Sequence, residues 1–299
     1  MKHFIGSYSL PDVTYHKPED LEEALILLKD HRGNCKLIAG CTDVIPDIRR
    51  GVLTLAEGSH LIDVRGIEGL KTIAIDQGQI NIGAAATFSA ILQSPVIIEQ
   101  SPLLAEVSRD LGSLQVKNAG TVGGNLCTAS PGADSAVALL ALDSRVIING
   151  LGHEKTVPLD EFFIGPGKTI LDNDEILTRV QFPAMGPDEK YCWVKIGRRK
   201  AFTMPVITVA TRVSIVDGMF DMVRIALGVA GPTPLRVKGA EDYLLGKEAT
   251  TPFIVEAAEI ASKEVRPRSS FRASAEYRRD MARVLTKRAL ASCLGLAQK

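Results

Sequence analysis

The sequence lacks the features that mark several common classes of protein. Lys+Arg and Asp+Glu number 35 each, so the 299-residue chain has no net charge and no electrostatic signature for nucleic acid or an anionic membrane. The longest apolar run, residues 136–142, is far too short to span a bilayer. The N-terminus, MKHFIGSYSLPDV, has no continuous apolar segment like that of a signal peptide. We therefore expect a cytoplasmic protein.

Patterns for disulfides, metals and nucleophilic catalysis are also missing. The five cysteines are Cys35, Cys41, Cys127, Cys192 and Cys293. They form no C-x-x-C pair, so a disulfide framework or a four-cysteine cluster is not expected. The five histidines are dispersed and form neither H-x-x-x-H nor H-E-x-x-H, so we predict no metal site. There is no G-x-S-x-G elbow and no evident Ser–His–Asp set, and we assign no catalytic side chain.

The most distinctive stretch is residues 115–134, QVKNAGTVGGNLCTASPGAD. It places Gly120, Gly123 and Gly124 within five residues, ahead of an apolar, helix-like run at 135–142. Such glycines permit positive φ, and successive N–H groups before a helix can bind a phosphate or diphosphate. A tight turn is the commoner alternative. A Rossmann site is not expected, because the predicted helix begins well after the glycine cluster instead of directly with it.

A second glycine turn lies nearer the N-terminus. A predicted strand at 35–39 runs into Gly40, and a short helix is predicted at 44–50. Backbone N–H groups, the Thr42 hydroxyl and a helix N-terminus could together bind an anion. The interpretation we prefer for Asp43 alone is an N-cap, whose side chain accepts an N–H of the next turn.

Strands and helices alternate irregularly along the first 180 or so residues, which indicates an α+β domain. Strands are predicted at 13–16, 35–39, 60–64, 71–75, 79–82, 145–149 and 175–182, and helices at 21–33, 44–50, 88–92, 103–114 and 135–142. Pro183, Gly186 and Pro187 then mark a boundary.

The remainder reads as a separate α+β domain. Strands are predicted at 191–196, 206–216 and 222–229, the last two paired around Asp217-Gly218, and helices at 237–245, 252–263 and 275–293. We interpret the basic turn at 197–200 and the pair Arg278 and Arg279 as solvated, with an anion or partner contact as the alternative.

Taken together, the two loops, 80 residues apart from Gly40 to Gly120, resemble the FAD-binding (medium) subunit of the molybdenum hydroxylases. This is the family of xanthine dehydrogenase and aerobic carbon monoxide dehydrogenase. The matching segments are LIAGCTDVIPDIRRG (37–51), NAGTVGGNLCTASPGADSAVALLALDSRV (118–146), DEILTRVQFP (174–183) and KIGRRKAF (195–202). The resemblance covers essentially the whole chain. It implies an α+β fold with a two-lobed FAD-binding part of the molybdopterin-dehydrogenase flavoprotein type, with lobes at 1–57 and 58–185, and a C-terminal α+β flavoprotein domain at 186–299.

The resemblance also implies the cofactor and its contacts. FAD would lie between the lobes, its diphosphate wrapped chiefly by backbone. The first loop would supply Ile38, Ala39, Gly40, Cys41, Thr42, Asp43 and Val44, and the second Gly120, Thr121, Gly123, Gly124 and Asn125. Asp134 would hydrogen-bond FAD near the ribityl or flavin end, Leu177 would line the ring, and Lys195 would approach the isoalloxazine. On sequence grounds alone, Lys195 reads as a surface residue beside the basic turn.

Two cysteines fall at these loops. The family's usual A-G-G-T-D has Cys41 in place of its second glycine, and we expect that this position does not need positive φ. Our hypothesis is that Cys41 or Cys127 approaches and tunes the flavin, with simple packing as the preferred alternative. There is no cysteine-bearing insertion for an extra iron–sulfur cluster of the kind found in 4-hydroxybenzoyl-CoA-reducing members.

The implied function is that of an FAD-carrying electron-transfer subunit. A molybdopterin-binding large partner would oxidise the substrate, and a small partner with two [2Fe-2S] clusters would pass electrons to FAD here. The flavin would then reduce an external acceptor such as NAD⁺ or a quinone. The alternatives are a free-standing flavin oxidoreductase, related to the enolpyruvyl-UDP-sugar reductases, or a flavin-binding regulatory or assembly protein without turnover.

Overall fold

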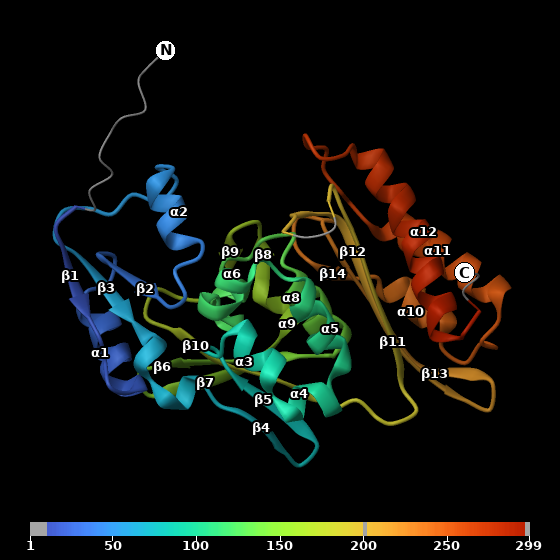
Figure 1. Cartoon of the computed structure of the whole chain (residues 1–299), viewed down its shortest axis with the longest axis horizontal. Coiled ribbons are helices and arrows are strands. Elements are labelled where there is room, and N and C mark those ends of the chain that lie inside the picture. The colour runs from blue at the N-terminus through green and yellow to red at the C-terminus, as the bar shows by residue number, and fades with distance from the viewer. Residues whose placement is uncertain (1–10, 200–201, 297–299) are drawn as a thin grey trace.

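The computed structural model describes residues 11–199 and 202–296 (Figure 1). Three parts follow one another along the long axis of the molecule, from the N-terminal end to the C-terminal end. We call them lobe 1, lobe 2 and the C-terminal domain. Among the helices of the described residues, none is both long and apolar enough to cross a membrane.

Lobe 1 is a small parallel sheet covered by one helix. Its strands β1 (Val13–His16), β3 (Ser59–Asp63) and β2 (Cys35–Ile38) lie in the order β1-β3-β2. Its helices are α1 (Leu21–Asp30) and α2 (Val44–Arg49), and the 3₁₀ turns Val64–Gly66 and Glu68–Leu70 lead into lobe 2. Asp20 caps α1 by accepting from the backbone N–H of Glu23. The apolar face of α1 packs on the sheet around the fully buried Ile62.

This topology corrects one predicted boundary. A division after residue 57 would separate β3 from the two strands on either side of it, although β3 is the central strand of the sheet. Lobe 1 therefore extends at least through Asp63. The predicted division between residues 185 and 186 stays a prediction.

Lobe 2 is built on an antiparallel sheet in the order β4-β5-β10-β6-β7. Its strands are β4 (Ile73–Asp76), β5 (Gln79–Gly83), β6 (Arg145–Gly150), β7 (His153–Pro158) and β10 (Ile176–Pro183), with a ribbon of β8 (Phe163–Gly165) and β9 (Lys168–Thr169). Its helices are α3 (Phe88–Gln93), α4 (Pro95–Gln100), α5 (Pro102–Asp110), α6 (Leu114–Ala119), α7 (Val122–Cys127), α8 (Asp134–Ala141) and α9 (Leu159–Phe162). Every residue of α8 is buried, so this helix is the centre of the molecule.

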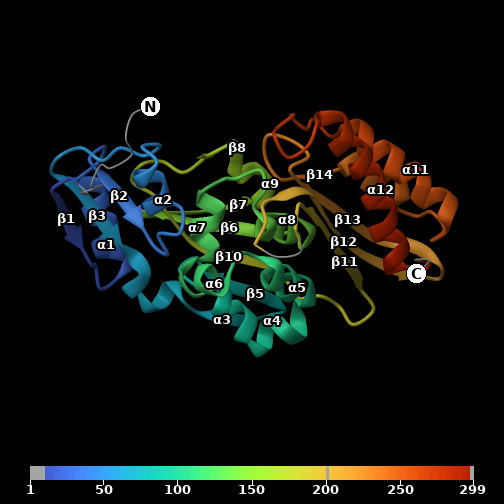
Figure 2. The same cartoon turned by 45° about the horizontal axis from the view of Figure 1, so that its top comes forward.

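The C-terminal domain is a sheet packed between helices on both faces. Its strands β11 (Lys190–Gly197), β12 (Pro205–Val216), β13 (Met219–Gly228) and β14 (Leu235–Arg236) are antiparallel and in sequence order. Its helices are α10 (Lys238–Leu244), α11 (Thr251–Glu264) and α12 (Ala275–Cys293). The helix α12 packs on β11 and β12, while α8 of lobe 2 packs against β12 and β13. Figure 2 shows α8 beside these strands, with α11 and α12 beyond them. Lobe 2 and the C-terminal domain are thus joined through a buried helix.

Most predicted elements are present, and the α+β class is confirmed. The predicted hairpin around Asp217-Gly218 is the β12–β13 pair, and α12 has the predicted bounds. The helix predicted to reach residue 114 ends at Asp110, because Gly112 takes a φ of 53°.

Arg278 is not solvated, contrary to our interpretation. It is only 1% exposed and donates to the carbonyl of Val206 at 3.0 Å and to the hydroxyl of Ser270 at 2.8 Å. Burial and nearby arginines lower the pKa of its guanidinium. Arg278 therefore ties α12 to the start of β12. Of the basic turn, Lys200 lies outside the described residues.

The prediction for this fold concerns Asp143, which follows α8. Its carboxylate forms ion pairs with Arg224 and Arg236 of the C-terminal domain. Asp143→Asn keeps a residue that tolerates the φ of 55° but leaves the Arg224 guanidinium without its counter-charge and Arg236 with Glu241 alone. We expect a loss of about 1–3 kcal/mol in the free energy of unfolding, measured by urea denaturation. Asp174→Asn is the control. Its pair with Arg32 is 3.6 Å long and largely exposed, so it should cost less than about 1 kcal/mol. Equal losses in the two variants would contradict this account.

Candidate functional site

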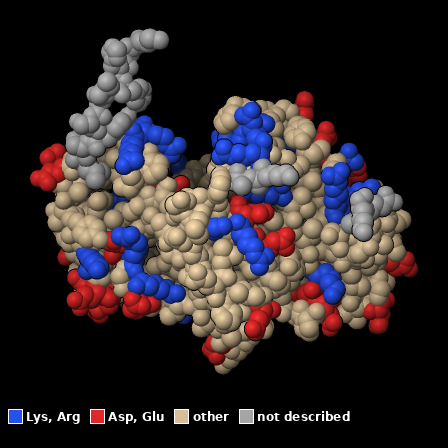
Figure 3. All heavy atoms as spheres, in the orientation of Figure 1, with Lys and Arg blue, Asp and Glu red and all other residues tan. Residues whose placement is uncertain are grey.

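A deep cleft lies where lobe 1, lobe 2 and the C-terminal domain meet. Its volume is about 830 Å³, within the range of small-molecule and cofactor sites. In the space-filling view the surface is hollowed at its upper edge, beside lobe 1 on the left (Figure 3). Every residue that we predicted for the cofactor site lines this cleft: Ile38, Ala39, Gly40, Cys41, Thr42, Asp43, Val44, Gly120, Thr121, Gly123, Gly124, Asn125, Asp134, Leu177 and Lys195.

The first loop presents unpaired backbone donors. It follows the end of β2 and runs into α2. Among the described residues, the N–H groups of Gly40, Cys41, Thr42, Asp43 and Val44 have no hydrogen-bond acceptor, whereas that of Ile45 donates to the carbonyl of Cys41. Backbone N–H groups need partners, and a run of free ones at a helix start suits an anion.

The second loop differs from the prediction. We expected a glycine loop in which positive φ is permitted, but helix α7 begins at Val122 and contains Gly123 and Gly124. Neither of these glycines nor Gly120 has positive φ. Thr121 caps the helix by accepting from the N–H of Gly124 at 3.1 Å. A strong N-cap here outweighs the low helix propensity of two glycines.

Most backbone donors of the second loop are already used inside the protein. The N–H groups of Val122 and Gly123 donate to the carbonyls of Ala86 and Ala84. A Cβ on Gly123 would lie 2.5 Å from the Cβ of Ala84, so this glycine lets α7 cross the chain after β5. The second loop is therefore a close-packed wall of the cleft, and the run of consecutive free donors belongs to the first loop.

The two loops touch each other directly. A Cβ on Gly40 would lie 2.0 Å from the carbonyl oxygen of Ala119, so only glycine permits this approach. The side chain of Asp43 adds a second link, accepting from the Thr128 hydroxyl at 3.2 Å. Our N-cap interpretation of Asp43 is wrong, because Asp43 occupies the N-cap position of α2 but its side chain makes no capping hydrogen bond. Its carboxylate instead joins lobe 1 to lobe 2.

At the far wall of the cleft, Lys195 of β11 meets Asp134 at the start of α8. The Lys195 Nζ donates to the Asp134 Oδ2 at 2.6 Å and to the carbonyl of Asp110 at 3.3 Å. The two side chains are only 10% and 7% exposed, so the expectation of a surface lysine is wrong. Burial raises the pKa of the Asp134 carboxyl, and the ammonium of Lys195 opposes this shift.

The second carboxylate oxygen of Asp134 is buried and has no hydrogen-bond partner among the described residues. A buried carboxylate oxygen without a partner is costly, so this atom is a ready acceptor for a ligand hydroxyl. Leu177 on β10 is 4% exposed and adds an apolar surface to the cleft.

Sequence analysis missed two apolar residues at the rim. Phe202 and Met204, between β11 and β12, line the cleft and are 58% and 53% exposed. Their only signal was that they follow the basic turn of the KIGRRKAF segment. Large apolar side chains left exposed beside a cleft favour a ligand or a partner there.

Cys41 has a φ of 57°, so our expectation that this position avoids the left-handed region is wrong. The left-handed conformation costs free energy for a residue with a Cβ, whereas glycine adopts it freely. Both Cys41 and Cys127 line the cleft. Their effect on a flavin stays a prediction.

This backbone strain yields a test. Cys41→Gly and Cys41→Ala both remove the thiol and differ only by a Cβ, so Cys41→Gly should be the more stable by about 1 kcal/mol. Chemical denaturation of the two variants measures the difference. Equal stability, or a more stable alanine variant, would mean that the left-handed conformation of this loop is not retained in solution.

Comparison with known proteins assigns the two parts of the chain separately. Residues 11–185 match the family model described as FAD binding domain in molybdopterin dehydrogenase. Residues 193–293 match the CO dehydrogenase flavoprotein C-terminal domain. The xanthine dehydrogenase FAD-binding subunit of Escherichia coli is 31% identical over 95% of this chain and 97% of its own. The carbon monoxide dehydrogenase medium chain of Hydrogenophaga pseudoflava is 31% identical over 94% of this chain and 96% of its own.

Solved structures agree with these relatives. A chain of the carbon monoxide dehydrogenase from Hydrogenophaga pseudoflava superposes with a TM-score of 0.91, at 30% identity, over 97% of this chain and all of that one. A chain of quinoline 2-oxidoreductase from Pseudomonas putida 86 gives 0.88 at 26% identity, with the same coverage. The protein therefore belongs to the molybdenum hydroxylase family, as an FAD-binding oxidoreductase subunit of the xanthine and carbon monoxide dehydrogenase type.

Proposed function

We propose that this subunit holds FAD in the cleft, with the diphosphate against the free N–H groups of residues 40–44. These five unpaired donors are the observation that carries the proposal. A diphosphate needs several hydrogen-bond donors, and backbone N–H groups supply them without a lysine cluster. The remaining predicted residues of the first loop, Ile38 and Ala39, position this run at the end of β2.

The second loop would close the other side of the diphosphate through its surface. Gly124 is exposed, and a Cβ built on it meets only the Thr121 hydroxyl, at 2.9 Å. The helix face at Gly124 is therefore bare backbone toward the cleft, which lets a ligand approach closely. That face would be positioned by its neighbours Gly120, Thr121, Gly123 and Asn125. The Asn125 side chain is fixed by the Ser135 hydroxyl, which donates to its carbonyl oxygen at 2.6 Å.

At the opposite end, Asp134 and Lys195 would face the ribityl and flavin part. When bound, FAD supplies the transfer of one or two electrons. The Lys195 ammonium, whose side chain is only 10% exposed, would provide a fixed positive charge that favours the negative charge of a reduced flavin. The unpartnered Oδ1 of Asp134 would accept a ligand hydroxyl, and Leu177 would pack on the ring. No general acid or base is required of this chain.

We further propose that the chain works as the electron-transfer subunit of a hetero-oligomer. Its relatives are named medium chains or FAD-binding subunits, and this chain matches them over nearly their whole length. Substrate would be oxidised at a molybdopterin cofactor on a large partner, and electrons would arrive from [2Fe-2S] clusters on a small partner. The external acceptor would be a carrier such as NAD⁺ or a quinone. A location in the cytoplasm stays a prediction from the sequence.

The whole-length match to subunits favours this function over a free-standing flavin oxidoreductase, which would need an acid and a substrate pocket of its own. A regulatory or assembly protein without turnover would bind flavin but would not carry its electrons. Rapid reduction of the bound flavin when substrate is added to the complex would distinguish an electron-transfer subunit from a regulatory or assembly protein.

The first test of the proposal compares Gly124→Ala with Gly69→Ala. The added methyl would lie on an exposed, cleft-lining residue, 2.9 Å from the Thr121 hydroxyl, so FAD affinity should fall at least tenfold, or about 1.4 kcal/mol. A Cβ on Gly69 would meet nothing within 4 Å, and Gly69 has no positive φ and does not line the cleft, so its variant should bind FAD normally. Flavin fluorescence titration of the apoprotein measures both. Unchanged affinity in Gly124→Ala would exclude this face from the site.

The second test concerns the partners. The chain should copurify with a molybdenum-containing large subunit and an iron–sulfur subunit when purified from its natural source. Metal analysis of the complex should then give molybdenum and iron in addition to flavin. A purified flavoprotein that is free of both metals yet oxidises a substrate unaided would favour the free-standing oxidoreductase.

A further inference from the structure

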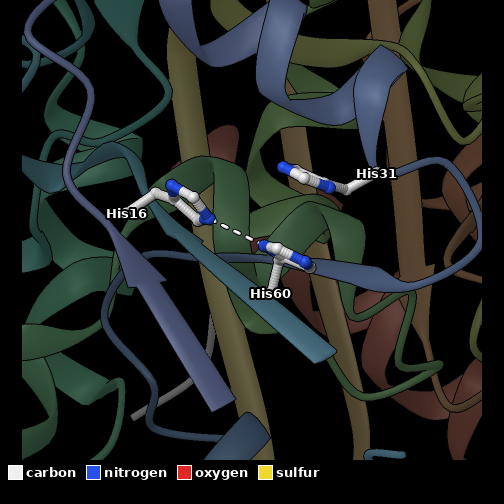
Figure 4. A group of neighbouring side chains, drawn as sticks. All are labelled: His16, His31 and His60. Carbon is white, nitrogen blue, oxygen red and sulfur yellow. Dashed lines mark hydrogen bonds between the residues drawn. The ribbon is translucent and has the colours of Figure 1, made fainter. Parts of the chain in front are cut away.

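Three of the five histidines meet in lobe 1, away from the cleft. His16 lies at the end of β1, His31 directly after α1, and His60 near the start of β3. Figure 4 shows the three rings gathered face to face beside the sheet, with the nitrogens of His16 and His60 directed at each other. We predicted no metal site because the histidines are dispersed along the chain. The fold nevertheless brings three of them together.

The topology explains this convergence. β1 and β3 are parallel, with Thr14 opposite His60 and His16 opposite Ile62. Side chains two apart on a strand share a face, so His16 and His60 both lie on the face of Ile62, which α1 covers. The end of α1 then brings His31 over the same place. Chain spacings such as H-x-x-x-H could not reveal a site that is assembled across a sheet.

The distances suit one small ion. One nitrogen from each of the three rings lies within 4.8 Å of the other two. The His16 Nε2 and the His60 Nδ1 are 2.8 Å apart, and the rings of His31 and His60 stack with centroids 3.5 Å apart. Around a tetrahedral zinc ion with Zn–N of about 2.0–2.1 Å, ligand nitrogens lie about 3.3 Å apart. The rings of His31 and His60 are stacked, so metal binding would require the partly exposed rings to rotate until their lone pairs meet at one point.

We propose that His16, His31 and His60 form a binding site for a divalent late transition-metal ion, with Zn²⁺ as the representative case. Three imidazoles without a carboxylate or thiolate in the group favour Zn²⁺, Ni²⁺ or Cu²⁺ over Mg²⁺ and Ca²⁺. All three rings are partly exposed, so a fourth position stays open to water. The ion would cross-link β1, the end of α1 and β3, and so stabilise lobe 1.

This site is independent of the proposed FAD site. His60 pairs with Cys35 at the start of β2, whereas the loop at Gly40 follows the end of β2. The length of the strand places the two about 10–15 Å apart. Metal binding and FAD binding can therefore be measured separately, and either can fail without the other.

The test is a Zn²⁺ titration of the full chain without a histidine tag, followed by equilibrium dialysis and metal analysis. We expect one equivalent to bind and to raise the melting temperature as its concentration rises. His31→Gln should weaken binding at least tenfold, and His16→Gln with His31→Gln should abolish it. The His31 backbone N–H donates to the carbonyl of Leu27, and this bond survives the substitution, so the single variant should fold normally.

His153→Gln is the matched control, because His153 lies in lobe 2 and hydrogen-bonds Glu175. It should bind Zn²⁺ like the original chain. Co²⁺ in place of Zn²⁺ should give spectra without thiolate charge-transfer bands, which separates the site from the five cysteines. Equal Zn²⁺ binding by the original chain and the His31 variants, or thiolate bands with Co²⁺, would overturn the proposal. No Zn²⁺ binding by the folded original chain would do so as well.

Discussion

The cleft depends on one backbone contact between segments 79 residues apart in sequence. Gly40 lies so close to Ala119 that any side chain at position 40 would overlap the Ala119 carbonyl. This contact fixes the first loop against the second, and the hydrogen bond from Thr128 to Asp43 reinforces it. The free N–H groups after Gly40 are consequently held toward the cleft instead of finding partners within lobe 1. A preorganised row of donors needs little rearrangement to bind an anion.

The other wall is set by burial. Helix α8 is enclosed on all sides, and its first residue, Asp134, has to pair with a cation or stay neutral. Lys195 supplies that cation from a strand of the C-terminal domain. The ion pair therefore joins the C-terminal domain to the cleft and leaves one carboxylate oxygen for a ligand. Three parts of the chain thus contribute to one site, which agrees with the match of both family models to this one chain.

Local patterns allowed much of the fold to be predicted. Period-3.6 apolar spacing located α1 and α12, and Asp217-Gly218 between two apolar runs located the β12–β13 hairpin. The family resemblance, which rests on two short motifs, correctly predicted that the residues proposed for the cofactor site lie together in one cleft. The shared sheet of β1, β2 and β3 was missed because strand order is set by tertiary packing, which leaves no local signal.

The predictions that were wrong all depend on tertiary contacts, which the sequence does not reveal. A lysine and an arginine, Lys195 and Arg278, read as surface residues because their buried partners lie far along the chain. The helix α7 was missed because glycine propensity argued against it, while the Thr121 cap and contacts with Ala84 favoured it. The positive φ of Cys41 follows from the turn that Gly40 begins. Each is a case of tertiary context overriding a local preference.

The most direct test of the central claim is amide hydrogen exchange with and without FAD. The account predicts that the N–H groups of residues 40–44, which have no acceptor among the described residues, exchange quickly in the apoprotein and become protected when FAD binds. Flavin bound with unchanged exchange at all five positions would contradict it, because the diphosphate would then lie elsewhere.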